Sequence, residues 1–551
     1  MNARLLLCLL IALLPAAGLA VAQDAAPLSP LPASAWNREA AAHLLRRAGF
    51  GGTAAEAESL HALGLEGAVD SLLDWEGQPD PRVPTPPIEV TARPGREELR
   101  DKTQEERQRI TRAYRAADNR QYALIREWWM QTMIRTAHPA RERLTLFWHG
   151  HFTSSYRDVR NSYHMFIQNT LLRRHAAGNF RELLDGISRD PAMLEYLDNN
   201  RNRKGQPNEN YAREVMELFT LGVGNYTEKD IKEAARAFTG WTFVGNRFVF
   251  DRNQHDTAEK QFLGQQGAFD GAAVLDIILT QPAASRFLAR KLFTYFAHAY
   301  PSDEIVEGLA RTLRESDWEL KPMLRRLFRS RSFSATPSVA TRIKSPVELI
   351  VSLYRALGMD STYAAGLSFL AGNLGQGLMD PPNVKGWAGG REWITTSNLL
   401  NRYNIAVSLV GMPEDKVRDM RNQNIRGMRK MMMEAMQRDP DSMEMGMEMS
   451  EEPAPSKKNK RGNRKRMAEY IEKVTFDVAA EARSLGLTDA NALVDHYCRT
   501  LLAVPASPEL RRTLLDYLDQ DGGFRMDAED APARLHGLLR LIVSTPEFQI
   551  S

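Results

Sequence analysis

Apolar residues recur three and four positions apart along most of the chain, which is the spacing of one face of an α-helix. The clearest such segments are 56–73, 163–175, 284–299 and 531–544. Helix signals flank many of them. Thr227, for example, precedes a helical pattern over 228–238, with Asp230 where a capping-box acid belongs. The pattern predicts a mainly helical protein.

One segment has the residue pattern of a β-hairpin. Residues 241–244 and 247–250 are rich in aromatic and β-branched residues, and Gly245-Asn246 between them suits a two-residue turn. Many helical segments against one hairpin predict an all-α fold with one small β-hairpin.

The first residues are typical of an export signal. Arg4 precedes the apolar run 5–14, and small residues then lead to Ala22. We therefore predict a signal peptide over 1–22 and a periplasmic or secreted protein. The run is shorter than the ~20 residues that span a bilayer, so we expect no stable membrane anchor. Cys498 would be the mature chain's only cysteine, which leaves no internal disulfide.

Composition divides the rest of the chain. We predict a flexible Pro/Ala-rich leader over 23–35, a main helical domain over 36–410, a disordered insertion over 411–467, and C-terminal helices over 468–551 that complete the same fold. The insertion stands out because its part 413–467 holds 11 of the 22 Met residues.

Charge argues against nucleic acid as a partner. The formal net charge is +3, and 413–467 alone carries 14 Lys and Arg against 10 Asp and Glu, or +4. The remainder is close to neutral, with no strongly basic folded segment.

Five ordered strings are specific enough to suggest a relative. They are HLLRRAGFG at 43–51, LFWHGHF at 146–152, PNENYARE at 207–214, FTGWT at 238–242 and PPNVKGW at 381–387. Together they resemble the domain of unknown function 1800 (DUF1800) family. The resemblance implies an exported bacterial protein, often encoded beside a sulfatase-like exported family, DUF1501, which becomes the expected partner. It implies no established activity.

Three histidines and one aspartate are candidate metal ligands. His149 and His151 flank Gly150, which could end a helix and let both rings turn toward one point. His255 and Asp256 lie on a predicted loop and could add an imidazole and a carboxylate, a set that suits a divalent metal such as zinc. Alternatively, the first two rings pack in the core or bond to backbone, and Asp256 caps a turn.

The predicted helix 208–221 supplies candidate acid–base groups. Arg213, Glu214 and Glu217 share one polar face by their spacing. Either glutamate could act as general base, with Arg213 binding substrate. Alternatively, the carboxylates are buried and simply pair with Arg213 or Arg236.

The Gly/Pro-rich segment 375–393 supplies candidate substrate contacts. Asn383 and Trp387 lie in it, and a Trp ring can stack on a sugar. Alternatively, the segment is an ordered loop that covers the core. Separately, Met alternates with Glu and Gly over 443–449, a spacing that either binds Cu(I) or reflects composition alone.

Two functions fit these residues. The first is a metal-dependent hydrolase acting on an extracytoplasmic substrate. The second is a non-enzymatic envelope protein that binds or assembles with the co-encoded sulfatase-like protein. Serine-hydrolase, zincin and nucleotide-binding signature motifs are absent from the sequence.

Overall fold

The computed structural model places most of the chain. It describes residues 26–89, 93–359, 366–411, 476–520 and 522–551. The predicted signal peptide, the Met-rich run 443–449 and nearly all of the predicted insertion lie outside the described residues.

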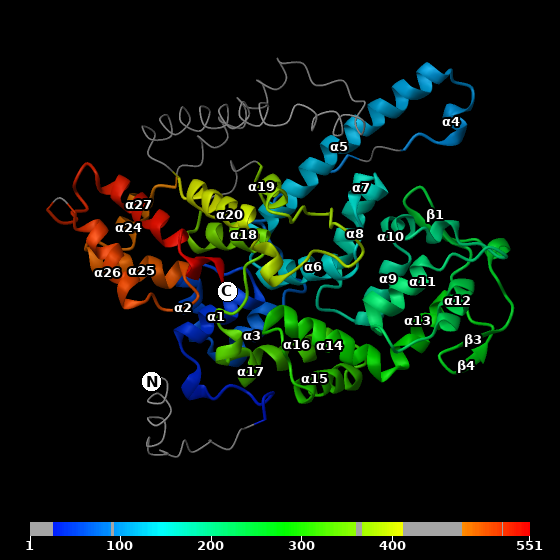
Figure 1. Cartoon of the computed structure of the whole chain (residues 1–551), viewed down its shortest axis with the longest axis horizontal. Helices are drawn as coiled ribbons and strands as arrows, with labels where there is room; N and C mark the ends of the chain where they lie inside the picture. Colours follow the sequence, from blue (N-terminus) through cyan, green and yellow to red (C-terminus); the bar gives the residue numbers. More distant parts are fainter. Residues whose placement is uncertain (1–25, 90–92, 360–365, 412–475, 521) are drawn as a thin grey trace, which may run out of the picture.

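Helices dominate the described residues, as predicted (Figure 1). The first group comprises α1 (Arg38–Ala48), α2 (Ala54–Ala62), α3 (Gly64–Leu73), α4 (Arg96–Arg100), α5 (Gln104–Arg135), α6 (Pro139–His151), α7 (Tyr156–Val159), α8 (Ser162–Arg174), α9 (Phe180–Ser188), α10 (Pro191–Tyr196), α11 (Asn210–Glu214) and α12 (Glu228–Ala237). The second group comprises α13 (Gly271–Thr280), α14 (Pro282–Phe296), α15 (Asp303–Glu315), α16 (Leu320–Arg329), α17 (Arg331–Ser334), α18 (Pro346–Ala356), α19 (Leu367–Asn373), α20 (Thr396–Leu409), α24 (Val478–Ser484), α25 (Ala490–Leu501), α26 (Pro508–Leu518) and α27 (Ala531–Val543). Single turns of 3-10 helix lie at Ala33–Ala35, Asn199–Arg201, Arg252–Gln254, Thr336–Ser338, Gly390–Trp393 and Pro546–Gln549.

Helix starts follow local capping chemistry. The predicted capping box of α12 is confirmed, since Thr227 and Asp230 bond to each other's backbone N–H groups. A capping box of Thr103 and Glu106 starts α5. The charged first half of α5 projects from the molecule, and its second half reaches the core with Trp129 and Met133 fully buried (Figure 1).

Two short hairpins interrupt the helices. The predicted one is confirmed, with β1 (Trp241–Val244) antiparallel to β2 (Arg247–Phe250). A second hairpin, which the sequence pattern does not predict, pairs β3 (Lys260–Phe262) with β4 (Gln265–Gly267). Its strands are three residues long, too short to show an alternating pattern.

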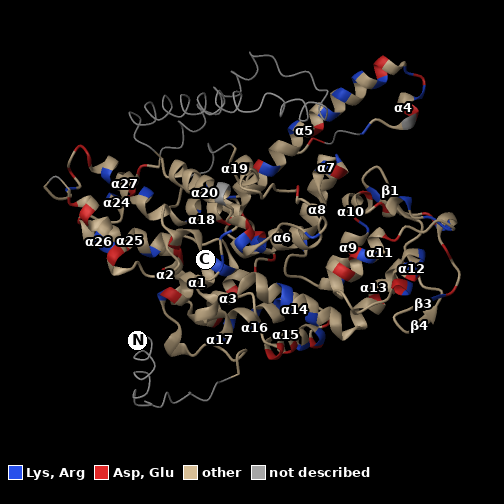
Figure 2. Cartoon of the chain, viewed as in Figure 1, with Lys and Arg blue, Asp and Glu red and all other residues tan. Residues whose placement is uncertain are grey.

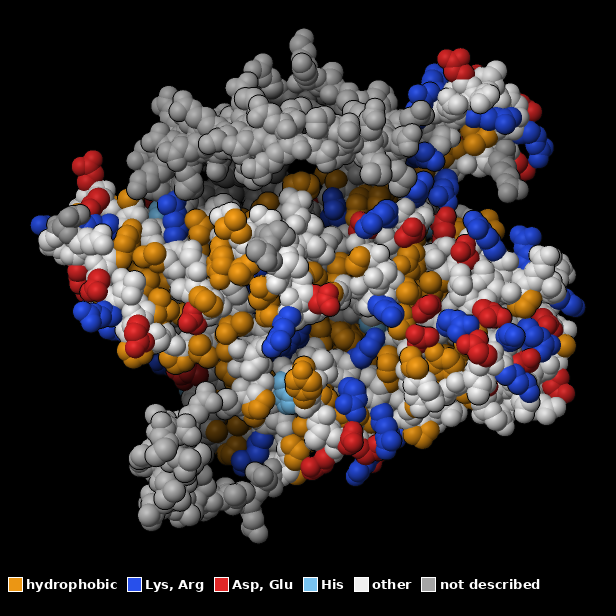
Figure 3. Space-filling view, viewed as in Figure 1, with side chains coloured by type: hydrophobic (Ala, Val, Ile, Leu, Met, Phe, Trp, Pro, Cys, Tyr) orange, Lys and Arg blue, Asp and Glu red, His pale blue; other side chains and the backbone are white. Residues whose placement is uncertain are grey.

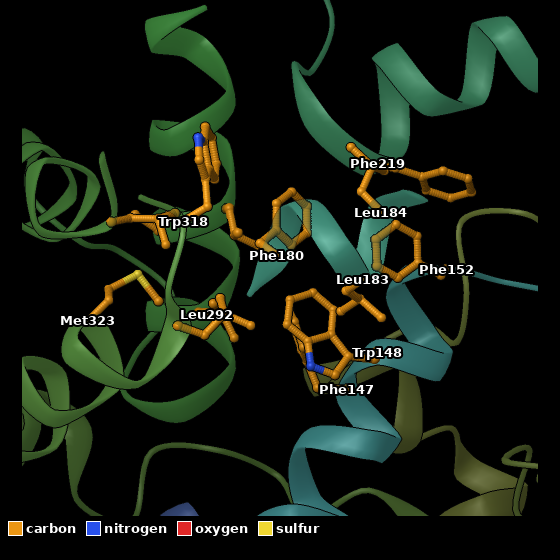
Figure 4. Close-up of a cluster of buried hydrophobic side chains, with 14 of the residues drawn as sticks. Phe147, Trp148, Phe152, Phe180, Leu183, Leu184, Phe219, Leu292, Trp318 and Met323 are labelled. Atoms are coloured by element: carbon orange, nitrogen blue, oxygen red, sulfur yellow. The ribbon is translucent and has the colours of Figure 1, made fainter. Parts of the chain in front are cut away.

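The helices enclose two hydrophobic cores that share α6. The first core contains Trp148 of α6 and Phe152, the residue directly after it, which Figure 4 shows beside Phe180 and Phe219. The second core contains Leu146 of α6 and residues of α5, α18 and the C-terminal helices. Because α27 contacts α20 and α25 contacts α18, the segment after residue 475 packs on helices that precede residue 411.

The chain from residue 26 to 35 lies against the first core. Leu28 is buried there, and Pro30 forms a β-bridge with Ser330. In the described residues, no single helix has the length and apolar character of a membrane span. Taken together, α13 and α14 would pass that test as a pair bent by 77°. Basic and acidic side chains are interspersed on the surface in Figure 3.

Candidate functional site

The helix α6 does not end at Gly150, which changes the expected geometry of the two histidines. Gly150 keeps a helical conformation, and the N–H of Phe152 donates to the carbonyl of Trp148 at 2.7 Å. Side chains two positions apart on a helix point roughly opposite ways. The expectation that both rings turn toward one point is therefore wrong.

His149 lies in an aromatic enclosure between α5 and the loop 381–387. Its ring centroid is 5.7 Å from that of Trp129 and 5.4 Å from that of Trp387. The side chain is 1% exposed, and neither ring nitrogen has a hydrogen-bond partner within the described part of the chain. Burial lowers its pKa from 6.5 to about 4, although Asp380 opposes the shift. His149 is therefore neutral at physiological pH.

His151 points into the first core and is held by hydrogen bonds. Its Nε2 lies 3.0 Å from the carbonyl of Phe219, and its Nδ1 lies 3.3 Å from Lys291 Nζ. A carbonyl only accepts, so Nε2 carries the hydrogen and Nδ1 accepts from the lysine. Burial and Lys291 lower the pKa of His151. Both nitrogens are occupied, so this ring offers no lone pair to a metal.

His255 and Asp256 lie beside the first hairpin, in contacts of their own. His255 Nδ1 is 3.0 Å from the carbonyl of Thr239, and its ring packs edge-on against Phe250. Asp256 Oδ2 accepts from Arg236 at 2.8 Å and Oδ1 accepts from the N–H of Ala258. These contacts match the alternative of an ordered turn with a paired carboxylate.

The four expected metal ligands consequently do not form one cluster. Across the described residues, no three His, Cys, Asp or Glu side chains lie close enough together to hold a metal ion. His149 and His151 point in different directions because the helix continues through Gly150, and His255 is held by contacts of its own beside the first hairpin.

Glu214 and Glu217 flank a change in helix type. α11 ends at Glu214 and continues as a π-helical turn over Val215–Thr220, in which Leu221 N–H bonds five residues back to Met216. Such turns are frequent at functional sites. Here two carbonyls of the turn accept bonds from outside it, Leu218 from Lys291 and Phe219 from His151.

The two carboxylates have different surroundings. Both side chains are partly exposed. Burial and the neighbouring Glu217 raise the pKa of Glu214, while Arg213 and Lys385 oppose this shift. Glu217 Oε2 accepts from the hydroxyl of Tyr226 at 3.0 Å. Glu214 therefore favours the protonated form more than an ordinary glutamate, and Glu217 is oriented by a phenol.

The loop 381–387 closes over the end of α6. Val384 packs on the first core and Trp387 on the second. Gly386 has a φ of +87°, and a Cβ there would lie 2.4 Å from the carbonyl oxygen of Gly150. Asn383 Oδ1 accepts from the backbone of Lys385, so Asn383 shapes the turn. The loop matches the core-covering alternative and brings Lys385 toward Glu214.

Arg213 lies near enough to act on the charge of Glu214, but its guanidinium is held by another carboxylate. Its guanidinium donates to both carboxylate oxygens of Glu228 on α12, at 2.9 and 3.0 Å. Arg213 would therefore have to leave this ion pair at the surface before it could bind a substrate.

Sequence reasoning missed Lys291 and Tyr226. Lys291 lies on α14, four residues after Phe287, and its ammonium contacts that ring at 4.8 Å. Burial lowers its pKa to about 8. The spacing of four residues between Phe287 and Lys291 places both side chains on one face of the helix, and this was the feature of the sequence that could have indicated the contact. Tyr226 lies in the turn before α12, and nothing in its spacing marks it.

These features define a mainly helical protein whose motif segments meet around the end of α6. The motif LFWHGHF provides the helix end, PNENYARE leads into the π-helical turn, and PPNVKGW provides the covering loop. The family model described as protein of unknown function (DUF1800) matches residues 43–550, so the chain belongs to this family. Neither the comparison with curated proteins nor that with solved structures gave a match.

Proposed function

We propose that the chain is an exported hydrolase in which Glu214 and Glu217 carry out acid–base chemistry on an ester or glycosidic bond of an extracytoplasmic substrate. The observation that carries the proposal is the pair of partly exposed glutamates in unequal surroundings beside the π-helical turn. Paired carboxylates whose environments separate their protonation serve as acid and base in many hydrolases.

Each carboxylate has a distinct role in the proposed reaction. Glu214, with its raised pKa, donates a proton to the oxygen of the leaving group. Glu217, oriented by Tyr226, takes a proton from the attacking water. Burial raises the pKa of Tyr226 to about 12, so its hydroxyl remains a donor. Trp387 and Lys385 lie on the adjoining loop, where they would contact the substrate.

The expected zinc ligands do not take part in the proposed reaction. A metal-dependent reaction through His149, His151, His255 and Asp256 would require these side chains to meet, and their contacts separate them. The catalytic role is accordingly assigned to the glutamates.

The test compares substitutions of two glutamates that lie close together in the sequence. Glu214→Gln removes the proposed acid and should reduce turnover of the best substrate in an ester, sulfate-ester and glycan panel by about 10²- to 10⁴-fold. Glu209→Gln, five residues earlier and also partly exposed, should retain activity. Equal activity of the two variants would refute the assignment of Glu214.

A second function is favoured by the ion pairs of the expected site residues. Arg213 pairs with Glu228 and Asp256 pairs with Arg236, so these two side chains are engaged in contacts within the chain rather than free for a substrate. In this case the chain would bind the co-encoded sulfatase-like protein in the envelope. Co-purification of the two from the periplasm, unchanged by Glu214→Gln, together with no turnover of any panel substrate would favour this function.

A further inference from the structure

A second polar cluster lies at the other end of α6, and the proposed reaction does not use it. It is a small pocket with a volume of about 50 Å³, lined in part by Arg46 of α1, Phe50, Arg143 of α6, Lys344, Glu348 of α18 and Phe548. The lining residues come in part from α1, α6 and α18, which Figure 2 shows in the middle of the molecule near the end of the chain. We call it the arginine pocket.

Positive charge exceeds negative charge around this pocket. The cations are Arg46, Arg47, Arg143, Arg342, Lys344 and Arg402, which interact electrostatically with one another or with Glu348. Arg143 Nη2 forms an ion pair with Glu348 Oε1. Among the described residues, none of the other five forms an ion pair with a carboxylate.

Several of these cations also keep unused donors. Arg143 is 1% exposed, and its Nε and Nη1 have no hydrogen-bond partner in the described part of the chain. The same holds for Nε of Arg46 and for Nη1 of Arg402, a fully buried residue. Buried donors are normally satisfied, so each of these groups requires an explanation.

Lys344 is the clearest case of a buried cation that forms no ion pair within the described part of the chain, although Glu348 is near enough to act on its charge. It is 4% exposed, and its ammonium lies 4.1 Å from the centroid of the Phe548 ring. Burial, followed by the charge of Arg46, lowers its pKa to about 7. Arg143 is likewise enclosed by rings, with its guanidinium carbon 5.2 Å from the Phe50 centroid and 4.9 Å from that of Tyr295.

We propose that the arginine pocket binds one small oxyanion of the size of inorganic phosphate or sulfate, held by Arg46, Arg143 and Lys344. Such an anion accepts several N–H bonds at once and supplies the missing negative charge. The volume allows it, because about 50 Å³ exceeds the roughly 10 to 15 Å³ that a cavity needs, on the same measure, to hold one water. The anion sits behind α6 and joins α1, α18 and the C-terminal segment.

The first test is direct binding to the full chain. Equilibrium dialysis with radiolabelled phosphate, at constant ionic strength in chloride, should give one site per chain. Competition with unlabelled sulfate then defines the specificity of the site. If sulfate displaces the labelled phosphate, the site binds small oxyanions in general; if sulfate does not displace it, the site is specific for phosphate. Absence of stoichiometric binding of either anion at millimolar concentration overturns the proposal.

Matched variants locate the site. Lys344→Gln should weaken anion binding at least tenfold, whereas Lys232→Gln, an exposed lysine on α12, should leave it unchanged. In anion-free buffer Lys344→Gln should also raise the melting temperature, because it removes a buried charge that has no counterion. Equal anion affinity in the two variants contradicts the proposal.

A second variant protects the test against a folding defect. Arg499 lines the same pocket but is exposed, so Arg499→Gln should fold normally. It should weaken phosphate binding several-fold and reduce its dependence on ionic strength. Arg46→Gln, made as a separate single variant, should have the same effect. If both variants are folded and both bind phosphate as tightly as the parent chain, the assignment is overturned.

Discussion

The two ends of α6 bury polar groups in opposite ways. At its start, Glu142 and Arg143 are buried as charges: Glu142 accepts from Arg173 and Trp129, and Arg143 pairs with Glu348. At its end, His149 is buried as a neutral ring with no hydrogen-bond partner among the residues that the structure describes. Charged side chains must be paired or they destabilise the fold, whereas a neutral imidazole among aromatic rings costs less. We therefore expect the contribution of the first end to folding stability to depend on charge balance, and that of the second end to depend on pH.

The largest effect is expected from the carboxylate that balances the arginine pocket. Despite burial, which alone would raise it, Arg143 and Arg342 lower the pKa of Glu348 to about 2. Glu348→Gln keeps an acceptor for the capping box with Ser345 but removes the charge. Unfolding in urea should show a loss of about 3 to 5 kcal/mol, because cations remain buried without a counterion.

A surface variant and a double variant sharpen this result. Glu58→Gln breaks only the exposed pair with Arg38 and should cost less than about 1 kcal/mol. Adding Lys344→Gln to Glu348→Gln should restore part of the lost stability, since it removes one unbalanced cation. If the double variant is no more stable than Glu348→Gln, charge balance is not what Glu348 provides.

The next effect concerns pH at the other end of the helix. His149 has a pKa of about 4 in the folded chain against 6.5 for the ordinary group. Between these values the unfolded chain binds a proton that the folded chain does not, so stability rises with pH over this window and is lost on acidification. The contribution of this ring is roughly 3 kcal/mol, complete above pH 6.5 and lost as pH falls to 4.

His149→Gln tests this prediction without requiring equal stability at neutral pH. The free energy of unfolding, measured from pH 7 to 4, should fall less steeply in the variant than in the parent chain. Other buried histidines contribute in the same direction, among them His43, whose pKa burial lowers to about 3, so a residual slope is expected. Identical slopes would mean that His149 is protonated in the folded chain.

Helical periodicity and caps were sufficient to predict the fold class, the β1–β2 hairpin and the start of α12, because these depend on neighbours within a few residues. Which of the two alternatives holds for His149 and His151 could not be predicted, and the structure matches the one in which the rings pack in the core and bond to backbone. Glycine usually weakens a helix, yet packing against the loop 381–387 keeps Gly150 helical. Tertiary contact thus overrode a local propensity.

The arginine pocket escaped prediction for a related reason. Its charged residues come from α1, α6, the start of α18 and α20, segments up to several hundred residues apart. Arg46, Arg143, Glu348 and Arg402 lie on helices whose other residues explain them as ordinary helical elements, and Arg342 and Lys344 lie in the segment that leads into α18. Only their joint burial shows the excess of positive charge, and burial of charge is not visible in a linear pattern.

The smallest effect is expected where the loop meets the end of α6. Gly386→Ala adds a Cβ at a φ of +87° and directs it at the carbonyl oxygen of Gly150, so loop or helix must shift. We expect a loss of about 1 to 3 kcal/mol, and a weaker hydrolase activity because Lys385 and Trp387 move with the loop. Gly389→Ala is the matched control, since no atom lies within 4 Å of its added Cβ. Urea unfolding and turnover on the same substrate measure both effects. If Gly386→Ala loses stability but keeps full activity, the loop only covers the core, and the substrate contacts proposed for Lys385 and Trp387 are wrong.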